Sequence, residues 1–249
     1  MNGTELKGRA YLISGSTRGI GLATARWLSQ RGARVLINSR NVPDCQRVAE
    51  QLGGAPIPFD VASETALKAA AKQIKASLGD ATLAGFIHCA GAMPLQPLLT
   101  TSLQDLNGVF ARHVGAGYAL SQRLSRMMAT SGQGSIVFLS SIVSQQGVCG
   151  QSAYAISKAA VNGMVVSLAA ELAPLNIRVN GVSPGLIDTD LTAVLGDEQR
   201  AEIAAATLLK RLGKPEEVAQ LIGFLLSDQA SYITAQIIGV DGGLRLPNP

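Results

Sequence analysis

Residues 9–31 read RAYLISGSTRGIGLATARWLSQR, an apolar run followed by a glycine-rich turn and then a helical pattern. The apolar run predicts a strand, and the segment after the turn predicts a helix. Between them, Gly15, Gly19 and Gly21 have the spacing Gly-x-x-x-Gly-x-Gly. A turn of this kind presents backbone N–H groups and the positive end of a helix, which together bind phosphate. The stretch therefore predicts a nucleotide-binding unit, although its spacing differs from the Gly-x-Gly-x-x-Gly fingerprint.

Apolar runs of strand length recur along the chain and alternate with helical patterns. Strands are expected at residues 9–13, 34–38, 56–59, 83–87, 136–139, 178–182 and 235–240, and long helices at 63–78, 103–130 and 153–172. Strands that alternate with helices predict a doubly wound parallel sheet with helices on both faces. No linker, repeat or low-complexity tract interrupts this order, so residues 1–249 are predicted to form one α/β domain.

The composition, 47% hydrophobic and 15% charged, is that of a chain with a large buried core. The chain shows neither a secretory leader nor 18 uninterrupted apolar residues, so a soluble, cytoplasmic protein without a membrane span is expected. Three cysteines and two histidines without metal spacing indicate neither a disulfide scaffold nor a metal site. The net charge is +4, but the basic residues are scattered, which does not indicate nucleic-acid binding.

The second predicted strand ends in Ser39-Arg40, without an acidic residue. In dinucleotide folds an acid at this place bonds the adenosine ribose, whereas a basic residue accommodates a 2′-phosphate. Arg18, inside the glycine turn, supplies a second guanidinium, whose planar fork of donors suits phosphate. We therefore expect a preference for NADP(H) over NAD(H). The alternative is that both arginines are simply solvated.

Ser140 and Ser141 follow the strand predicted at residues 136–139, and Tyr154 and Lys158 lie four residues apart in a helical segment. Positions i and i+4 of a helix share one face, so the phenol and the ammonium point into the same space. A nearby cation favours the phenolate and lowers the tyrosine pKa, while a serine hydroxyl can hold a carbonyl oxygen at the site of proton transfer. Taken alone, the pair is also compatible with an alanine-rich core helix that carries an incidental Tyr and Lys.

These residues, taken in order, resemble the short-chain dehydrogenase/reductase family in its compact single-domain form. The resemblance rests on Ser14 to Gly21, Asp60, Ala90-Gly91, Ser141, Tyr154, Lys158, Pro184-Gly185 and the ending Gly239-Val240-Asp241-Gly242-Gly243. It implies a Rossmann-type sheet of seven parallel strands, commonly assembled as a homotetramer. It also implies an enzyme that transfers a hydride between a nicotinamide cofactor and a ketone or secondary alcohol.

The resemblance assigns roles by position. Tyr154 would donate the proton in reduction, Lys158 would hold the nicotinamide ribose and tune Tyr154, and Ser141 would bind the substrate oxygen. The cofactor would be held by Gly15, Ser16, Thr17, Arg18, Gly19, Ile20, Gly21, Ser39, Arg40, Asp60, Val61, Ala90, Gly91, Tyr154, Lys158, Pro184, Gly185, Ile187 and Thr189.

The chain departs from the family at two places. It has His88-Cys89-Ala90-Gly91 where the family has Asn-Asn-Ala-Gly, and His113 stands where the family carries an Asn that supports a water link to the lysine. One hypothesis is that His113 takes over this relay as a fourth catalytic residue and makes activity sensitive to mildly acid pH. The alternative is a packed or surface histidine without a catalytic part.

The segment Arg211 to Ala219 resembles that of 3-oxoacyl-acyl carrier protein reductases of fatty acid biosynthesis, so the expected substrate is a 3-oxoacyl thioester. An acidic acyl carrier protein would then be a possible partner, steered by Arg123 and Arg126, two arginines that are also explained as a solvated helix face. The first alternative is a reductase of a sugar, steroid or secondary-metabolite ketone. The second is a protein that binds NADP without turnover.

Overall fold

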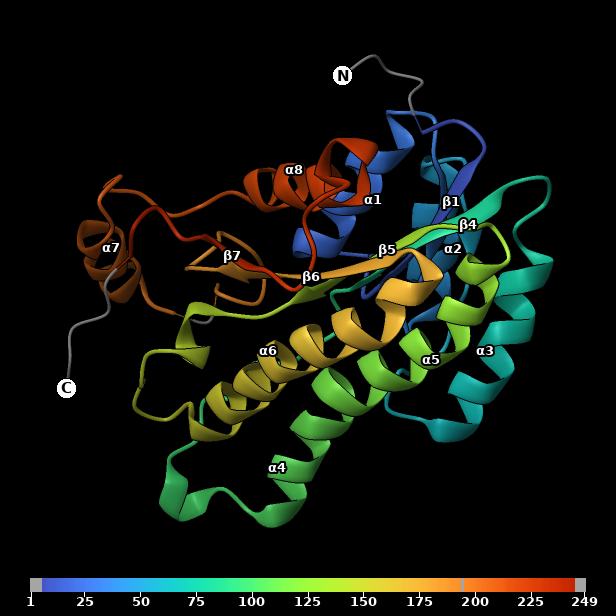
Figure 1. Ribbon diagram of the computed structural model, residues 1–249. Helices are drawn as coiled ribbons and strands as arrows, with labels where there is room; N and C mark the ends of the chain where they lie inside the picture. Colours follow the sequence, from blue (N-terminus) through green and yellow to red (C-terminus); the bar gives the residue numbers. More distant parts are fainter. Residues whose placement is uncertain (1–5, 194, 245–249) are drawn as a thin grey trace.

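Seven parallel strands form one sheet at the centre of the protein (Figure 1). The computed structural model describes residues 6–193 and 195–244. The strands are β1 (Arg9–Ser14), β2 (Arg34–Ile37), β3 (Ala55–Pro56), β4 (Thr82–His88), β5 (Gly134–Leu139), β6 (Ile177–Pro184) and β7 (Ile237–Val240). They lie in the order β3-β2-β1-β4-β5-β6-β7, which confirms the predicted doubly wound parallel sheet.

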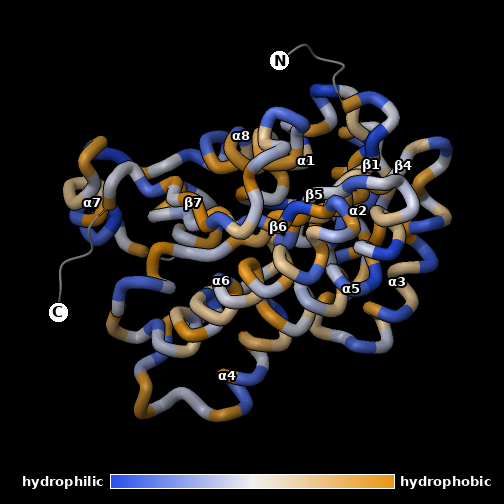
Figure 2. The backbone as a smooth tube through the Cα atoms, viewed as in Figure 1, coloured by the Kyte–Doolittle hydropathy of each residue, from blue (hydrophilic) through white to orange (hydrophobic). Residues whose placement is uncertain are grey.

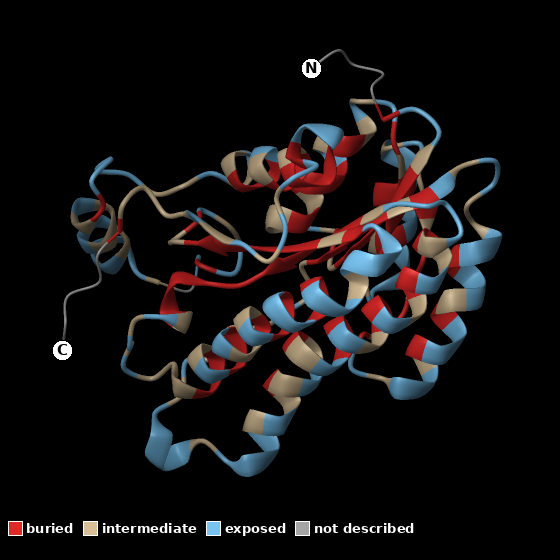
Figure 3. Ribbon diagram, viewed as in Figure 1, coloured by how far each residue is buried: buried red, intermediate tan, exposed pale blue. Residues whose placement is uncertain are grey.

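Helices cover both faces of the sheet. They are α1 (Gly19–Ser29), α2 (Val42–Gln51), α3 (Glu64–Ala76), α4 (Leu103–Phe110), α5 (Ala116–Ala129), α6 (Ser152–Leu172), α7 (Asp197–Ala206) and α8 (Pro215–Leu226). One apolar core joins the sheet to α3, α5 and α6, and a second joins it to α1, α2 and α8. The strands are therefore buried between two helical layers (Figure 3).

Side chains along each strand alternate between the two cores, as the pleat requires. In β1, Leu12 packs into the core under α3, α5 and α6, whereas Tyr11 and Ile13 pack under α1, α2 and α8. Because both faces are covered, the strands are apolar almost throughout, which is the pattern of a parallel sheet. In the hydropathy view these strands run through the middle of the molecule, between the two layers of helices (Figure 2).

The order of the strands reverses between β1 and β4. From β1 the chain winds outward to β3, and α3 then brings it back to the other side of β1. In open parallel sheets the crevice at such a switch point, at the carboxyl ends of the strands, is where ligands bind. The glycine turn follows β1 and Ala90-Gly91 follow β4, so both segments lie at this crevice.

Two of the predicted elements differ from the structure. The helix expected over residues 103–130 is α4 and α5 joined by a π-helical turn, Ala111–Gly115, which holds an extra residue. The strand expected at 56–59 is only Ala55–Pro56, because Pro56 and Pro58 lack the N–H groups that a longer ladder needs.

Helix α6 is apolar over most of its length. Ser152–Leu175, which is α6 with the turn after it, matches a membrane span by length and composition, and it is the only such helix among the described residues. However, α6 packs on the sheet through Val161, Val165 and Leu168. It is therefore a core helix of the fold.

Candidate active site

The glycine turn lies directly against the chain segment that follows β4. Gly15 has φ +66°, and a Cβ added to it would lie 2.8 Å from the Cα of Ala90. At the start of α1 the first turn has no acidic residue, and the side chain of its N-cap residue Arg18 makes no capping bond. This helix end therefore leaves its backbone N–H groups open to an anion such as the phosphates of a dinucleotide.

Asn38, at the end of β2, holds this turn in place from beneath. Its amide nitrogen donates to the carbonyl oxygens of Ile57 and Phe59, at 2.9 and 3.2 Å, and its amide oxygen accepts from the Gly15 N–H at 3.3 Å. The next residues, Ser39 and Arg40, face the cavity. The adenosine end of a dinucleotide site is thus built from the ends of three neighbouring strands.

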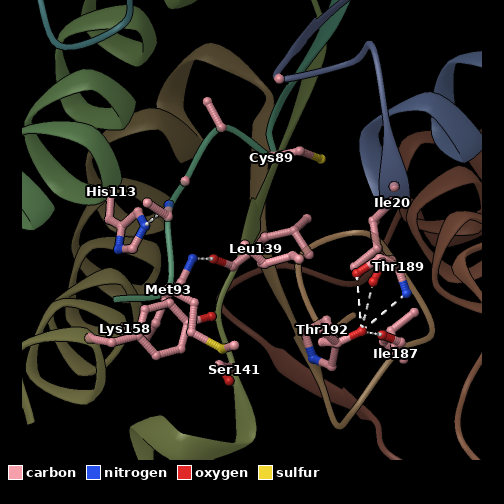
Figure 4. Close-up of a pocket in the computed structure, with 18 of the residues that line it drawn as sticks. Ile20, Cys89, Met93, His113, Leu139, Ser141, Lys158, Ile187, Thr189 and Thr192 are labelled. Carbon is pink, nitrogen blue, oxygen red and sulfur yellow. Dashed lines mark hydrogen bonds between the residues drawn. The ribbon is translucent and has the colours of Figure 1, made fainter. Parts of the chain in front are cut away.

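The proposed catalytic side chains meet where β5 ends. Ser141 follows that strand, while Tyr154 and Lys158 extend from α6, and all three are at most 9% exposed. The Lys158 ammonium lies 5.6 Å from the centre of the Tyr154 ring and donates to the Leu139 carbonyl oxygen at 2.7 Å (Figure 4). The adjacent Ser140 is engaged elsewhere, because its hydroxyl donates to Asn162 Oδ1 at 2.6 Å. Of the two serines, Ser141 is the one beside Tyr154, because its Oγ accepts the Val143 N–H at 3.4 Å and its side chain hydrogen-bonds with Tyr154.

Burial governs the protonation of this pair. It lowers the pKa of Lys158 to about 8 and raises that of Tyr154, with a smaller opposing effect from a hydrogen bond with Ser141. We expected the ammonium to lower the tyrosine pKa. The structure differs from this expectation: the ammonium is directed at the Leu139 carbonyl oxygen, and burial raises the pKa of Tyr154.

His113 lies in the π-helical turn and is 1% exposed. Its Nε2 accepts from the Ala92 N–H at 3.1 Å, its Nδ1 lies 2.8 Å from Ser157 Oγ, and its ring meets the Tyr154 ring edge-on at 5.5 Å. Burial, followed by the charge of Lys158, lowers the pKa of His113 to about 2. The expected change of charge between pH 5 and 8 is therefore wrong, because the imidazole is already neutral throughout that range.

One cavity of about 810 Å³ connects all of these groups. It extends from the glycine turn past Arg40 and Asp60 to Ser141 and Tyr154. Beyond β6 it is bounded by the turn that holds Ile187 and Thr189, where the Thr192 hydroxyl donates to the Ile187 carbonyl oxygen at 2.6 Å (Figure 4). A nucleotide bound on the glycines would thus lie in the same cavity as Tyr154.

Known proteins resemble this chain over almost its whole length. Residues 15–245 match a family model described as Enoyl-(Acyl carrier protein) reductase. A 3-oxoacyl-[acyl-carrier-protein] reductase FabG of Thermotoga maritima is 37% identical over 245 residues, which cover 96% of this chain and 99% of that protein. The FabG of Escherichia coli K12 is 33% identical over 244 residues, covering 97% and 99%. The chain belongs to the short-chain dehydrogenase/reductase family. This dehydrogenase/reductase is accordingly an oxidoreductase.

Solved structures agree with this assignment. A 3-oxoacyl-[acyl-carrier protein] reductase from Brucella melitensis superposes with a TM-score of 0.90 at 31% identity, covering 98% of this chain and 93% of that one. A 7α-hydroxysteroid dehydrogenase complexed with NADH and 7-oxo glycochenodeoxycholic acid gives 0.91 at 31% identity, covering 98% and 97%. The dehydrogenase/reductase thus shares its fold with proteins that are named for different substrates.

Most of the residues assigned from the sequence line the cavity of this dehydrogenase/reductase. They are Gly15, Thr17, Arg18, Gly19, Ile20, Gly21, Ser39, Arg40, Asp60, Val61, Ala90, Gly91, His113, Ser141, Tyr154, Lys158, Pro184, Gly185, Ile187 and Thr189. Ser16 is the exception and does not line the cavity. It is fully buried, and its hydroxyl donates to the Ile13 carbonyl oxygen at 2.8 Å, so its side chain stabilises the turn from within.

Sequence reasoning missed several residues that line the same cavity. They are Asn38, Met93, Arg112, Gln151 and Leu244. Gln151 stands out because its side-chain Oε1 is buried without a hydrogen-bond partner, which is costly unless a ligand supplies a donor. Its position three residues before Tyr154 was the available signal, since it places Gln151 at the start of α6.

Proposed function

We propose that the protein is an NADPH-dependent carbonyl reductase that converts a 3-oxoacyl thioester into the 3-hydroxyacyl thioester. The observation that carries this proposal is the convergence of Ser141, Tyr154 and Lys158 in the same cavity as the glycine turn. The glycine turn, the uncapped end of α1 and the arginines beside it fit a dinucleotide phosphate.

The chain's own groups account for binding and proton transfer. The Ser141 hydroxyl donates a hydrogen bond to the substrate carbonyl oxygen, and Tyr154 gives that oxygen its phenolic proton as the alcohol forms. With a pKa of about 8, Lys158 is mostly protonated at neutral pH, so it stabilises the phenolate that Tyr154 leaves behind. A bound reduced nicotinamide supplies the hydride.

Cofactor choice is assigned to Arg40 and Arg18. Both guanidinium groups are exposed and line the cavity, and no acidic residue stands at the end of β2 to select a free ribose. We expect Arg40→Asp to raise the KM for NADPH at least about 10-fold, since a charge-assisted contact of 1.5–3 kcal/mol is replaced by repulsion. The KM for NADH should fall or stay unchanged. Unaltered selectivity between NADPH and NADH in this variant would contradict the role of Arg40 in cofactor choice.

The wall beyond Tyr154 suits an acyl chain. An apolar cluster formed by Ile142, Val143, Tyr154 and Leu244 lies there, with Met93, Val148 and Ile203 packed against it. The test compares NADPH oxidation with acetoacetyl thioesters, sugar ketones and cyclic ketones. Turnover of a steroid or sugar ketone alone would favour the alternative of a different reductase. Binding of NADPH without turnover of any ketone would favour the non-catalytic alternative.

An acyl carrier protein is the proposed carrier of the substrate. Arg126 on α5 is exposed, whereas Arg123 is half-buried and donates to the carbonyl oxygen of Ala119 in its own helix, so Arg126 is the better candidate for steering. Steering of an acidic partner weakens as salt is added. We expect kcat/KM for an acyl carrier protein substrate to fall with ionic strength, and Arg126→Glu to weaken it further. Kinetics indifferent to both changes would contradict carrier steering.

The proposed setting is the cytoplasm, and the proposed assembly is a homotetramer. Support for assembly comes from Tyr118 on α5 and from Ile156 and Val166 on α6, apolar or aromatic side chains that remain about half exposed. Assembly through α4, α5 and α6 would cover them.

A further inference from the structure

One of the two histidines, His113, lies in the π-helical turn and the other, His88, contacts that turn, and each uses both of its ring nitrogens. His88, at the end of β4, places Nδ1 2.8 Å from Ser14 Oγ and Nε2 2.9 Å from the Arg112 carbonyl oxygen. His113 places Nε2 3.1 Å from the Ala92 nitrogen and Nδ1 2.8 Å from Ser157 Oγ. These contacts join β1, β4, the π-helical turn and α6.

The partners of His113 determine where its proton resides. A backbone N–H can only donate, so the Nε2 that faces Ala92 must be an unprotonated acceptor. A neutral imidazole then carries its proton on Nδ1, which donates to Ser157 Oγ. The Ser157 hydroxyl in turn donates to the Tyr154 carbonyl oxygen at 2.7 Å. His113 is thus linked, through one hydroxyl, to the backbone of the catalytic tyrosine.

The partners of His88 require the opposite tautomer. A carbonyl oxygen can only accept, so the Nε2 that faces Arg112 carries the proton. Nδ1 then accepts from the Ser14 hydroxyl, whose oxygen accepts the Ala90 N–H at 3.2 Å. Each ring therefore has one tautomer that satisfies all of its contacts.

The fit between His113 and the loop after β4 is close. A Cβ added to Gly91 would lie 2.7 Å from His113 Nε2. The loop of residues 90–92 therefore rests directly on the imidazole, with Ala92 hydrogen-bonded to it and both Ala90 and Gly91 lining the cavity. The His113 ring thus contacts the loop of residues 90–92 on one side and Ser157 of α6 on the other.

We propose that His113, as the neutral Nδ1–H tautomer, is a positioning residue that holds Tyr154 and the loop of residues 90–92 in register through Ser157 and Ala92. A proton relay is not its role, because the partner of Nε2 is a backbone N–H, which cannot pass a proton on. The inference rests on the proposed reductase function for its kinetic consequences only.

The surroundings of His113 keep it neutral. Lys158 from α6, His88 from β4 and the neighbouring Arg112 all disfavour a second proton on the ring, and burial is the largest effect. A doubly protonated ring would also turn Nε2 into a donor facing the Ala92 N–H, which breaks that bond. The tautomer is therefore maintained by geometry and by charge together.

The first experiment reads the tautomers directly. Magic-angle-spinning NMR of protein labelled with 15N only in histidine should show two neutral rings, one protonated on Nδ1 and one on Nε2, with no titration between pH 5 and 8. His88→Asn should remove the Nε2–H signal and leave the Nδ1–H signal. A His113 ring that is protonated on Nε2, or that titrates in this range, would overturn the proposal whether or not the protein reduces ketones.

The second experiment separates the two contacts by kinetics. In His113→Asn the side-chain amide stands in place of Nδ1 and can still donate to Ser157, whereas in His113→Gln it stands in place of Nε2 and can still accept from Ala92. Misplacing a reacting group by about 1 Å can cost about 100-fold in rate. We expect His113→Gln and Ser157→Ala to lower kcat about 10- to 100-fold with little change in the KM for NADPH, whereas His113→Asn should mainly raise that KM.

His113→Leu should show both the lower kcat and the higher KM for NADPH. His88→Asn is the matched control, because it also removes a buried histidine but one that does not contact Ser157. If kcat and KM changed equally in the three His113 variants and in Ser157→Ala, and these changes followed the loss of melting temperature, the role of His113 would be purely structural and positioning would be contradicted. A kcat that falls only below a pKa near 6 in the wild type would restore the relay.

Discussion

At the scale of single residues, Gly15 shows how closely the nucleotide turn is packed. Its φ of +66° disfavours any side chain, and a Cβ there would lie within 3 Å of the Ala90 backbone. We expect Gly15→Ala to destabilise the protein by about 1–3 kcal/mol, because the left-handed conformation and the contact both oppose a methyl group. It should also weaken NADPH binding, since the turn must shift to relieve the contact.

Thermal unfolding and titration with NADPH measure both effects of Gly15→Ala. Gly108→Ala is the control, because Gly108 lies inside α4 with nothing within 4 Å of an added Cβ. That substitution should be neutral or stabilise the protein slightly. A Gly15→Ala protein with unchanged NADPH affinity would show that the turn does not bind the phosphates.

Residue roles that depend on local spacing were predictable, and those that depend on distant partners were not. Tyr154 and Lys158 share a helix face whatever the rest of the fold does. Gln151, in contrast, is noticeable only because its Oε1 is buried without a partner, which requires the folded cavity. The same holds for Asn38, whose partners Ile57 and Phe59 lie about twenty residues away in sequence.

At the scale of elements, Glu217 ties the start of α8 to the segment before it. Its carboxylate accepts two hydrogen bonds from Arg211, at 2.8 and 2.6 Å, and the Lys214 N–H at 2.8 Å. These bonds lower the pKa of Glu217 to about 2. A carboxylate with a depressed pKa stabilises the fold fully above its unfolded value of 4.5, and this contribution disappears as the pH falls toward 2.

We therefore expect Glu217→Gln to lower the free energy of unfolding by about 0.5–1 kcal/mol at pH 7, the usual range for a helix cap and a partly exposed ion pair. Urea unfolding at pH 7, 4 and 3 should show the difference from wild type shrinking at the lower pH values. Glu216→Gln, at an exposed neighbouring position, should have no such effect. A difference that is independent of pH would contradict the assigned ion pair.

The alternation of strands and helices was predictable from apolar patterning, but the interruption between α4 and α5 was not. No proline marks the π-helical turn Ala111–Gly115, and its apolar pattern continues that of the flanking helices. The reason for the turn lies in tertiary contacts, because it brings the Arg112 carbonyl oxygen to His88 and the His113 ring to Ser157. Such contacts leave no trace in local sequence.

At the scale of the whole molecule, the outer surface of α5 and α6 predicts self-association. Tyr118, Ile156 and Val166 are each about half exposed on neighbouring helices of one face. Burial of apolar area contributes about 25 cal/mol per Å², so covering this face favours a stable oligomer. We expect sedimentation of an oligomer at micromolar concentration and of smaller species for Val166→Glu. Val42→Glu, on α2 at the other face of the sheet, is the control, and a monomeric wild type would refute the prediction.

The arrangement of the molecule follows from few sequence features. Parallel strands linked by helices, with a nucleotide turn after the first strand, restrict the topology to a doubly wound sheet. The place of the site follows too, because ligands bind where the strand order reverses. The identity of the ketone does not follow, since a solved structure with the same fold and 31% identity is a steroid dehydrogenase complexed with 7-oxo glycochenodeoxycholic acid.

The central claim is that Tyr154 protonates a 3-oxoacyl thioester while NADPH is oxidised. The most direct test follows NADPH oxidation with an acetoacetyl thioester for the wild type and for Tyr154→Phe. The account predicts turnover by the wild type and a loss of about 10²- to 10⁴-fold in kcat for the variant, with NADPH still bound. Equal rates for the two proteins, or no turnover of the thioester by the wild type, would contradict it.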